Sequence, residues 1–368
     1  MMNTIDRYIF RSLLTNYLIS LFVMLCLYVT LDMFVNMDEF TEDGSPPLTV
    51  VFNMVDYYWP NLFLYFSQLS GAITLFSCMA VLARMRRLNE MTAILASGVS
   101  LWRVARPIVI FGISTSMLLV VDTEFIIPSV AHLLARDHDD ADGERAYEVL
   151  FVKDRDNALL SAGEFHPRTK QLKRILVLVR DEYGRVARTV EADSAVWEPP
   201  PIPGEPGRWI LTRGQQVSRV HYEDDIFGPR FGVNSSLLQN YPSDLSPEQL
   251  LLRQSESWIK FLSLSQLRQQ ELRQDTDLGT ILRAKHQRVT APIMSMVLLL
   301  LGLPFFLDRS PANVLSDTGK CILACGSCFL VSFVGQSVRP EAGSAIVAWI
   351  PIFLYTTIAV VLIDRIRT

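Results

Sequence analysis

Six long apolar segments, each nearly free of charge, constrain the fold of this chain more than any other feature of its sequence. A helix needs about 20 apolar residues to cross a hydrocarbon core of roughly 30 Å. Each segment is expected to be helical, because a helix pairs its own backbone groups where lipid offers no hydrogen bond. The predicted spans are residues 13–35, 60–83, 104–131, 289–307, 321–338 and 346–363.

Arginines near the ends of the spans predict the side of the membrane on which each loop lies. Lys and Arg beside a span resist translocation, whereas acidic residues matter little. Two arginines precede the first span, five lie between residues 84 and 106, and two follow the last span. The loop of residues 36–59, on the opposite side, holds no Lys or Arg. Both termini are therefore predicted to be cytoplasmic, and the long segment after the third span to be extracytoplasmic.

The segment between the two groups of three spans has the pattern of a β domain. Short runs of alternating residues are separated by turn signals, which favours an antiparallel sandwich or jelly roll. A helical pattern follows from Ser246 onward and leads back to the membrane. The predicted strands are residues 148–152, 158–161, 174–180, 186–191, 194–197, 208–212 and 215–221.

The predicted fold is an α-helical membrane protein with six transmembrane helices, three before and three after an inserted extracytoplasmic antiparallel β jelly-roll domain. Its parts are a first transmembrane bundle at residues 1–131, the β domain at 132–272 and a second bundle at 273–368. All five cysteines fall inside predicted spans, so the β domain is expected to fold without disulfides.

Catalytic and metal-binding motifs are not evident in the sequence. Gly319-Lys320 lacks the upstream glycine and the following Ser or Thr of a phosphate loop. His138 stands where a calcium loop needs an aspartate, in an acidic segment whose role is left open, residues 137–142. We therefore predict no catalytic residue, no metal site and no cofactor, and a protein that is not an enzyme.

The segment of residues 84–107, between the second and third spans, carries the most functional information. Its periodicity predicts a short amphipathic helix at about residues 86–100 on the cytoplasmic surface. The helix is either a simple connector or a docking helix, whose Glu90 and small neighbours fit a groove on a cytoplasmic partner. One face would hold Leu88, Met91, Leu95 and Trp102. The candidate docking residues are Leu88, Glu90, Met91, Leu95, Ser97 and Gly98.

Small and polar residues also recur inside the spans. In the fifth span, spacings of four, three and four predict a narrow stripe of small side chains, at Cys321, Cys325, Cys328 and Ser332. Small residues mark close approach of helices in lipid, so the stripe serves either packing within the chain or a subunit seam or lipid path. Asp32, near the end of the first span beside Asn36, is either functional or interfacial, because charge is costly in hydrocarbon.

Three stretches resemble the lipopolysaccharide-export ABC transporter permeases, the YjgP/YjgQ or LptF/LptG family. They are Ile5-Asp6-Arg7-Tyr8, the run from Asn89 to Ser100, and the hairpin from Ala195-Val196-Trp197 to Trp209-Ile210-Leu211. The similarity covers essentially the whole chain. The opening Asp-Arg-Tyr looks nearer the LptG branch than the LptF branch.

The resemblance implies a permease subunit of an ABC exporter in the cell inner membrane. In such an exporter two related permeases pair, a separate cytoplasmic ATPase dimer drives them, and periplasmic jelly-roll domains pass lipopolysaccharide to a periplasmic bridge. By match to the motif, Glu90 would lie in the coupling helix that docks into the ATPase, and the first and fifth spans would border the lipid cavity. The alternative is a membrane anchor or mechanotransmission subunit, whose periplasmic domain binds a protein partner without transporting lipid.

One departure from the family concerns the cargo. Permeases that handle lipopolysaccharide carry lysines near the outer end of the first span, where this chain has Asp32, Asp38 and Glu39. Carboxylates repel a phosphorylated lipid. Either a partner permease supplies the positive charge, or the cargo is a less anionic lipid. The sequence leaves open the cargo, the branch and whether the chain pairs with itself.

Overall fold

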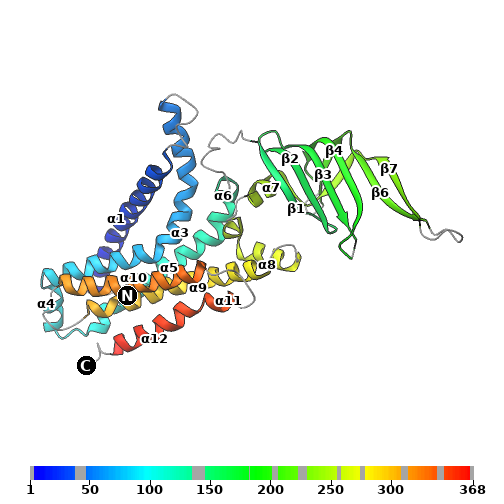
Figure 1. The fold of residues 1–368 in the computed structure, drawn as a ribbon. Helices are drawn as coiled ribbons and strands as arrows, with labels where there is room; N and C mark the ends of the chain where they lie inside the picture. The colour runs from blue at the N-terminus through cyan, green and yellow to red at the C-terminus, as the bar shows by residue number, and fades with distance from the viewer. Residues whose placement is uncertain are drawn as a thin grey trace. The chain divides into compact units, whose positions relative to one another are not determined.

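The computed structural model describes ten stretches of the chain: residues 4–37, 47–134, 146–181, 183–200, 206–222, 230–254, 258–273, 278–307, 314–337 and 344–364. They form two compact units (Figure 1). The helical unit comprises Met1–Asp38, Tyr58–Val130 and Ile259–Thr368. The β unit comprises Glu39–Tyr57 and Ala131–Trp258. Asp38, Glu39 and the acidic segment 137–142 lie outside the described residues.

Within the described residues, five helical stretches are long and apolar enough to cross a membrane: Thr4–Val35, Val50–Arg87, Leu101–Ala131, Gly279–Phe305 and Leu315–Gly335. The helices in them are α1 (Thr4–Val35), α3 (Pro47–Arg87), α5 (Leu101–Val121), a π-helical turn η1 (Asp122–Ile126), α6 (Ile127–Leu134), α9 (Leu278–Gly302), a 3-10 turn η4 (Leu303–Phe305) and α10 (Val314–Ser337). The short α4 (Glu90–Ala96) joins α3 to α5.

The sixth predicted span is shorter than expected. It divides into α11 (Ser344–Val347) and the apolar α12 (Ile350–Asp364), with a turn between them. Pro351 explains where α12 begins, because proline lacks a backbone N–H and is tolerated only in the first turn of a helix. The prediction of one unbroken helix over residues 346–363 is therefore wrong in its first turn.

The core of the helical unit forms around α9, which packs against α5, α10 and α12 (Figure 1). Gly112 of α5 shows how closely these helices approach. A Cβ at Gly112 would lie 2.3 Å from Cδ2 of Leu299 in α9, so a larger residue would require the Leu299 side chain or the helix to shift. Small residues are used at such contacts, because packing rather than hydrophobic exclusion holds helices together in lipid.

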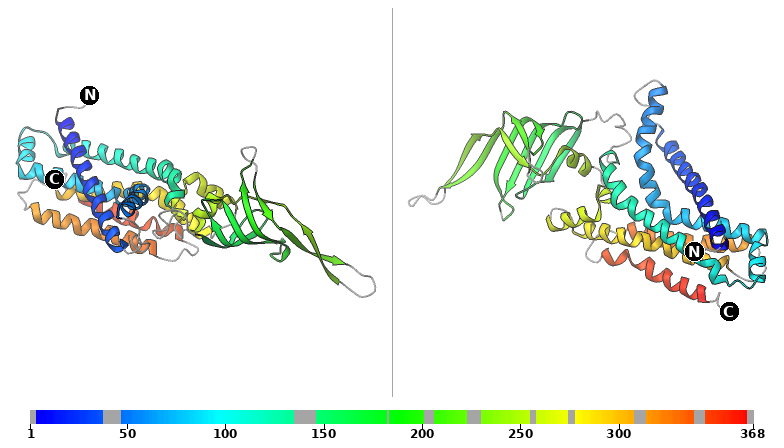
Figure 2. Two further views of the ribbon diagram at one scale, coloured as in Figure 1. Left: turned by 90° about the horizontal axis from the view of Figure 1, so that it is seen from above. Right: turned by 180° about the vertical axis from the view of Figure 1, so that it is seen from behind.

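The β unit is one branched antiparallel sheet. The long strand β4 pairs with β3 on one edge, while its other edge pairs first with β6 and then with β5. The sheet order is β1-β2-β3-β4-β5-β8, and β7 pairs with β6. Figure 2 shows β6 and β7 extending as a two-stranded ribbon from the rest of the sheet. The strands are β1 (Tyr147–Lys153), β2 (Ala158–His166), β3 (Gln171–Arg180), β4 (Val186–Glu198), β5 (Gly207–Thr212), β6 (Gln215–Tyr222), β7 (Arg230–Leu237) and β8 (Asn240–Ser243).

The predicted fold class, a helical membrane protein with an inserted antiparallel β domain, is confirmed. Two details differ. The predicted strands 186–191 and 194–197 are one strand, β4, because Ala192-Asp193 contains no turn-forming signal strong enough to interrupt it. The strands β7 and β8 were not predicted. The polar run Asn234-Ser235-Ser236 and Pro242 interrupt the alternation of polar and apolar residues that indicates a strand.

Alternation along the strands builds the β core. In β5, Gly207, Trp209 and Leu211 are buried, while the residues between them are exposed. Trp209 lies directly opposite Trp197 of β4, with ring centroids 5.0 Å apart. The Trp197 ring covers Gly207, where a Cβ would lie 2.2 Å from its Cζ2 atom. This tryptophan pair stabilises the hairpin that resembles the permease family.

Three short helical segments follow β8: α7 (Pro247–Gln254), the 3-10 turn η3 (Trp258–Phe261) and α8 (Leu264–Arg273). Of these, α7 belongs to the β unit and contributes Leu250, which is buried in the β core beside Leu245.

We expect residues 131–258, expressed without the membrane helices, to fold as a soluble β protein, because this segment has its own apolar core and no cysteine. Circular dichroism should show a β spectrum and one cooperative thermal transition. A shorter control ending at residue 243 loses Leu245 and Leu250 and should be less stable by at least about 3 kcal/mol. A helix-dominated spectrum, or equal stability of the two fragments, would contradict this prediction.

Candidate functional site

The junction between α3 and α5 contains the predicted docking helix, in a shorter form than expected. Asn89 adopts a left-handed conformation with φ of 58° and separates α3 from α4, and Gly98, with φ of 83°, follows the end of α4. Asn and Gly are the residues that accept this conformation most readily. Consequently α4 covers only Glu90–Ala96 instead of residues 86–100.

These two breaks separate residues that were expected to share one apolar face. Leu88 lies in the turn before α4 and is 58% exposed, whereas Met91 is buried and Leu95 is half-buried. Trp102 belongs to α5 and is 49% exposed. The prediction of a common face for these four residues is wrong, because the chain changes direction at Asn89 and again at Gly98.

Met91 anchors α4 in the core of the helical unit. Its side chain belongs to the buried cluster that includes Met85 of α3, Val104 of α5 and Ile9 of α1. The outward residues of α4 and the following turn are mostly small and exposed: Thr92, Ala93, Ala96, Ser97 and Gly98. Small exposed side chains therefore lie on the same short helix as a residue of the buried core of the helical unit.

The Glu90 carboxylate is positioned by hydrogen bonds between residues of the same chain. The Tyr8 hydroxyl of α1 donates a hydrogen bond to Glu90 Oε2 at 2.8 Å, and Arg84 Nη2 of α3 donates to the Tyr8 hydroxyl at 3.1 Å. The three side chains link α1, α3 and α4 in one polar chain. Glu90 is half-buried, so its carboxylate is positioned while remaining accessible from solvent.

Asp32 is hydrogen-bonded by tyrosines of α3. Its Oδ2 accepts hydrogen bonds from the hydroxyls of Tyr58 at 3.0 Å and Tyr65 at 3.2 Å. The Asn36 backbone N–H donates to the Asp32 carbonyl as part of the helical ladder at the end of α1. A carboxylate in an apolar helix needs such donors, because leaving it unpaired in hydrocarbon is expensive.

The stripe of small residues in α10 faces the interior of its own chain. Cys321, Cys325 and Cys328 are almost completely buried. The sulfur of Cys321 lies 3.7 Å from the Met79 sulfur, and that of Cys325 lies 3.9 Å from the Leu298 carbonyl oxygen. Packing within the chain therefore accounts for the three thiols. Ser332, farther along, is half-buried and donates to the Cys328 carbonyl.

Sequence reasoning missed a cluster of charged residues in the helical unit, one of which, Asp122, is buried. Asp122 opens the π-helical turn η1 and is 1% exposed, and neither of its carboxylate oxygens accepts a hydrogen bond from a described residue. Arg288 of α9 interacts electrostatically with Asp122 and Glu124 and donates hydrogen bonds to the carbonyls of Thr123, Lys260 and Leu262.

Glu124 completes this cluster by accepting the Leu264 backbone N–H, at 2.9 Å for the nearer oxygen. The segment before α8 is thus held by hydrogen bonds from Arg288 to the carbonyls of Lys260 and Leu262, and by the bond from the Leu264 N–H to Glu124 of η1. Two acidic residues inside the predicted span 104–131 were the signal that could have revealed this cluster, because charges in membrane helices usually have a role. The π-helical turn η1 points the same way, because such turns inside α-helices are frequently found at functional sites.

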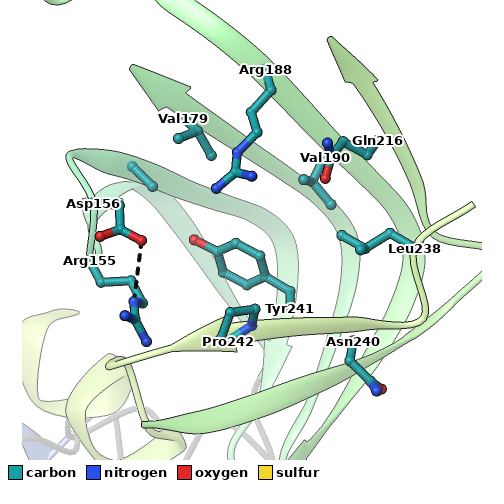
Figure 3. Close-up of a pocket in the computed structure, with 11 residues that line it drawn as sticks. Arg155, Asp156, Val179, Arg188, Val190, Gln216, Leu238, Asn240, Tyr241 and Pro242 are labelled. Carbon is teal, nitrogen blue, oxygen red and sulfur yellow. Dashed lines mark ion pairs between the residues drawn. The ribbon is translucent and has the colours of Figure 1, made fainter. Parts of the chain in front are cut away.

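A small pocket lies inside the β unit, between β8 and the strands opposite it. Its volume is about 110 Å³, below the roughly 300–1,000 Å³ of typical small-molecule sites. Figure 3 shows Tyr241 and Arg188 pointing into this space, with Val179, Val190 and Leu238 forming an apolar wall. The Arg155 and Asp156 side chains form an ion pair of 3.4 Å at its edge.

Asp154 ties the chain after β1 to β8. Its carboxylate accepts the Ser243 hydroxyl at 2.6 Å and the backbone N–H groups of Asp244 and Arg155. Burial raises the pKa of Asp154, although these hydrogen bonds act in the opposite direction. Burial also raises the pKa of Tyr241, with a further contribution from the nearby Asp154 carboxylate. These contacts stabilise the rim of the pocket and supply no catalytic pair.

Comparison with known proteins identifies the family. The model of the family described as "Lipopolysaccharide export system permease LptF/LptG" matches residues 7–365, nearly the whole chain. No curated protein matches the sequence. The family match covers both the helical unit and the inserted β unit, and it agrees with the resemblance carried by the run from Asn89 to Ser100. The chain is therefore a member of the LptF/LptG family of lipopolysaccharide export permeases, and an integral membrane protein.

Proposed function

We propose that the chain is a permease subunit of an ABC exporter that extracts lipopolysaccharide or a related lipid from the inner membrane. A separate cytoplasmic ATPase dimer hydrolyses ATP, a second related permease completes the translocation path, and the β unit passes the lipid to a periplasmic bridge. Both termini and α4 then lie on the cytoplasmic side, and the β unit lies in the periplasm. The arginines at residues 84–106 support this orientation.

The surface of α4 is the observation that carries the proposal. A transporter driven by another subunit must receive force at a cytoplasmic contact and pass it into its membrane helices. Small exposed side chains at Ala93, Ala96 and Ser97 allow close docking, and Met91 connects the same helix to the buried core. Displacing α4 would therefore strain the core to which α1, α3 and α5 also contribute, since core packing is dense and transmits strain.

The exposed apolar surface of α1 supports a second permease. Along its strongly apolar stretch the helix buries no residue against its own chain, and Phe22, Leu31 and Phe34 are among the exposed side chains. The residues of α1 that are fully buried in the core, Ile9, Leu13 and Tyr17, lie in its first half. The exposed face of the rest of α1 is therefore available for a lipid path shared with a partner subunit.

Asp32 bears on the cargo. Because its carboxylate is held by Tyr58 and Tyr65, α1 presents a paired acidic group where related permeases carry lysines. This favours either positive charge from the partner permease or a cargo lipid with less phosphate. The two possibilities differ in whether lipid A phosphates are required for release.

Reconstitution tests the proposal. The chain is purified with its co-expressed ATPase and related permease, placed in vesicles with lipopolysaccharide or a dephosphorylated form, and supplied with ATP and the soluble bridge protein. We expect lipid transfer to the bridge protein that requires ATP, and no transfer with an ATPase variant that binds but does not hydrolyse ATP. A complex that hydrolyses ATP but transfers neither lipid would instead support the mechanotransmission alternative.

A further inference from the structure

A buried ion pair connects the end of α3 to the start of α10. Arg86 Nη1 donates to Asp317 Oδ2 at 2.8 Å, and the two side chains are only 9% and 8% exposed. The same nitrogen donates to the Phe305 carbonyl at 3.4 Å, in the turn that follows α9. Lys320 lies 3.5 Å from the other oxygen of Asp317 but is largely exposed. Through Arg86, the last turn of α3 is thus joined to the turn after α9 and to the first turn of α10.

Arg86 also belongs to the turn that begins α4. Its carbonyl accepts the Asn89 backbone N–H at 3.0 Å, and the Asn89 carbonyl accepts the N–H of Ala93 in α4. The backbone of Arg86 therefore holds the turn before α4, while its side chain holds α10. A single residue links that turn to Asp317.

The last turn of α3 carries a second arginine that contacts a different helix. Residues two apart on a helix are separated by roughly 200° around its axis, because each residue turns by about 100°. Arg84 donates to the Tyr8 hydroxyl of α1, whereas Arg86 donates to Asp317 of α10. The contact made by Arg84 is exposed, and that made by Arg86 is buried. The end of α3 is therefore tied to α1 on one side and to α10 on the other.

Stability alone does not require a charged pair between α3 and α10. Replacing a buried ion pair by well-packed apolar residues is often neutral or stabilising, because the cost of removing two charges from water can exceed their attraction. Packing between the two helices is already present nearby, where the Cys321 sulfur lies 3.7 Å from that of Met79. Apolar contacts are non-directional, whereas a charge-assisted hydrogen bond fixes both distance and direction. The ion pair therefore adds a directed link at the end of α3 that lies nearest α4.

We propose that Arg86 is a positioning residue that passes a displacement of α4 to α10 through its ion pair with Asp317. This inference rests on the proposed function, in which an ATPase docks on α4. Leu323, Leu330 and Val334 of α10 are exposed, so movement of this helix changes the surface that the chain presents to lipid or to a second permease. In this role Arg86 touches neither the ATPase nor the lipid.

A fluorescent probe on α10 tests the link directly. Of the five cysteines, Cys26 is exposed and the other four are buried, so Leu323→Cys in a Cys26→Ser background gives one exposed thiol on α10. The chain, labelled before assembly, is reconstituted with its related permease and an ATPase variant that binds ATP without hydrolysing it. We expect ATP to change the emission of the probe, and Arg86→Met to reduce that change by at least about threefold. Arg87→Met, at an exposed arginine of the same turn, should leave the change intact in complexes with equal amounts of ATPase.

A double variant separates this role from a purely structural one. Arg86→Met removes the cation that lies 2.8 Å from the buried Asp317 carboxylate, so it should also lower the thermal unfolding temperature. Arg86→Met combined with Asp317→Leu removes both charges and should regain most of that stability. We expect the probe response, and the lipid released per ATP hydrolysed with wild-type ATPase, to stay low in this double variant. An ion pair that serves stability alone would instead recover both together with the unfolding temperature.

The outcomes distinguish this inference from the proposed function. A complex that binds the ATPase but transfers no lipid would contradict lipid export, yet the probe response would still test the link from α4 to α10. The role of Arg86 would be overturned by a probe that does not respond to ATP in the wild-type complex, by equal losses in Arg86→Met and Arg87→Met, or by full recovery in the double variant. An unchanged response in Arg86→Met would overturn it as well. If Arg86→Met alone does not fold, the double variant and Arg86→Lys, which keeps the charge and should retain most of the response, decide the question.

Discussion

Glu90→Lys is expected to leave the chain inserted in the membrane while binding of the ATPase weakens by about 2–5 kcal/mol, as for a broken charge pair at an interface. The carboxylate already lies beside a cation, because Arg84 donates to the same Tyr8 hydroxyl that binds Glu90. A lysine at this position would lose the Tyr8 hydrogen bond and face Arg84 with a like charge. Pull-down of the ATPase and lipid release per ATP hydrolysed measure the effect.

Two control variants separate docking from internal positioning. Glu90→Gln keeps an acceptor oxygen for Tyr8 and should have a milder effect than Glu90→Lys. Tyr8→Phe removes the hydrogen bond within the chain but keeps the carboxylate. If Glu90 contacts the ATPase, Tyr8→Phe should change binding only slightly. If Tyr8→Phe is as harmful as Glu90→Lys, Glu90 acts by joining α1 to α4. Wild-type binding and coupling in Glu90→Lys would make α4 a simple connector.

Arg288→Ala is expected to destabilise the helical unit by at least about 2 kcal/mol, because hydrogen bonds from a charged group contribute about 1.5–3 kcal/mol each and several would be lost. The guanidinium interacts electrostatically with the buried Asp122 carboxylate and donates to three backbone carbonyls, including that of Leu262 at 2.8 Å. Alanine leaves the carbonyls unpaired and Asp122 without a nearby cation. The yield of monodisperse protein in detergent and its thermal unfolding temperature measure the loss.

A double-mutant cycle isolates the charge interaction. Asp122→Asn removes the buried charge and should be milder than Arg288→Ala, because Arg288 keeps Glu124 and its carbonyl partners. The Asp122→Asn and Arg288→Ala double variant should be more stable than Arg288→Ala alone, since no uncompensated carboxylate remains at residue 122. Arg268→Ala, on the exposed side of α8, should have little effect. Equal stability of Arg288→Ala and Arg268→Ala would contradict a structural role for Arg288.

The larger elements of the fold could be predicted because their signals are local. A run of apolar residues such as 104–131 has no stable alternative to a membrane helix, and the alternation of β5 places Trp209 and Leu211 on one face. Boundaries were less predictable where a single residue changes the direction of the chain. Periodicity continues through Asn89, so only its backbone conformation reveals that α4 begins at Glu90.

Contacts between distant segments depended on tertiary structure. The sequence placed Cys321, Cys325 and Cys328 on one face of a helix, but it did not show whether that face meets its own chain or another subunit. A lipid-facing and a protein-facing surface can be equally apolar, so hydrophobic patterning does not distinguish them.

The sequence by itself determined the membrane helices, the inserted β domain and the family resemblance, because each depends on residues near one another in the chain. Only the tertiary structure brought Tyr8 to Glu90 and Arg288 to Asp122. The physical reason is that charge compensation in a low-dielectric interior is set by distance in space, and residues far apart in sequence become partners only when helices pack.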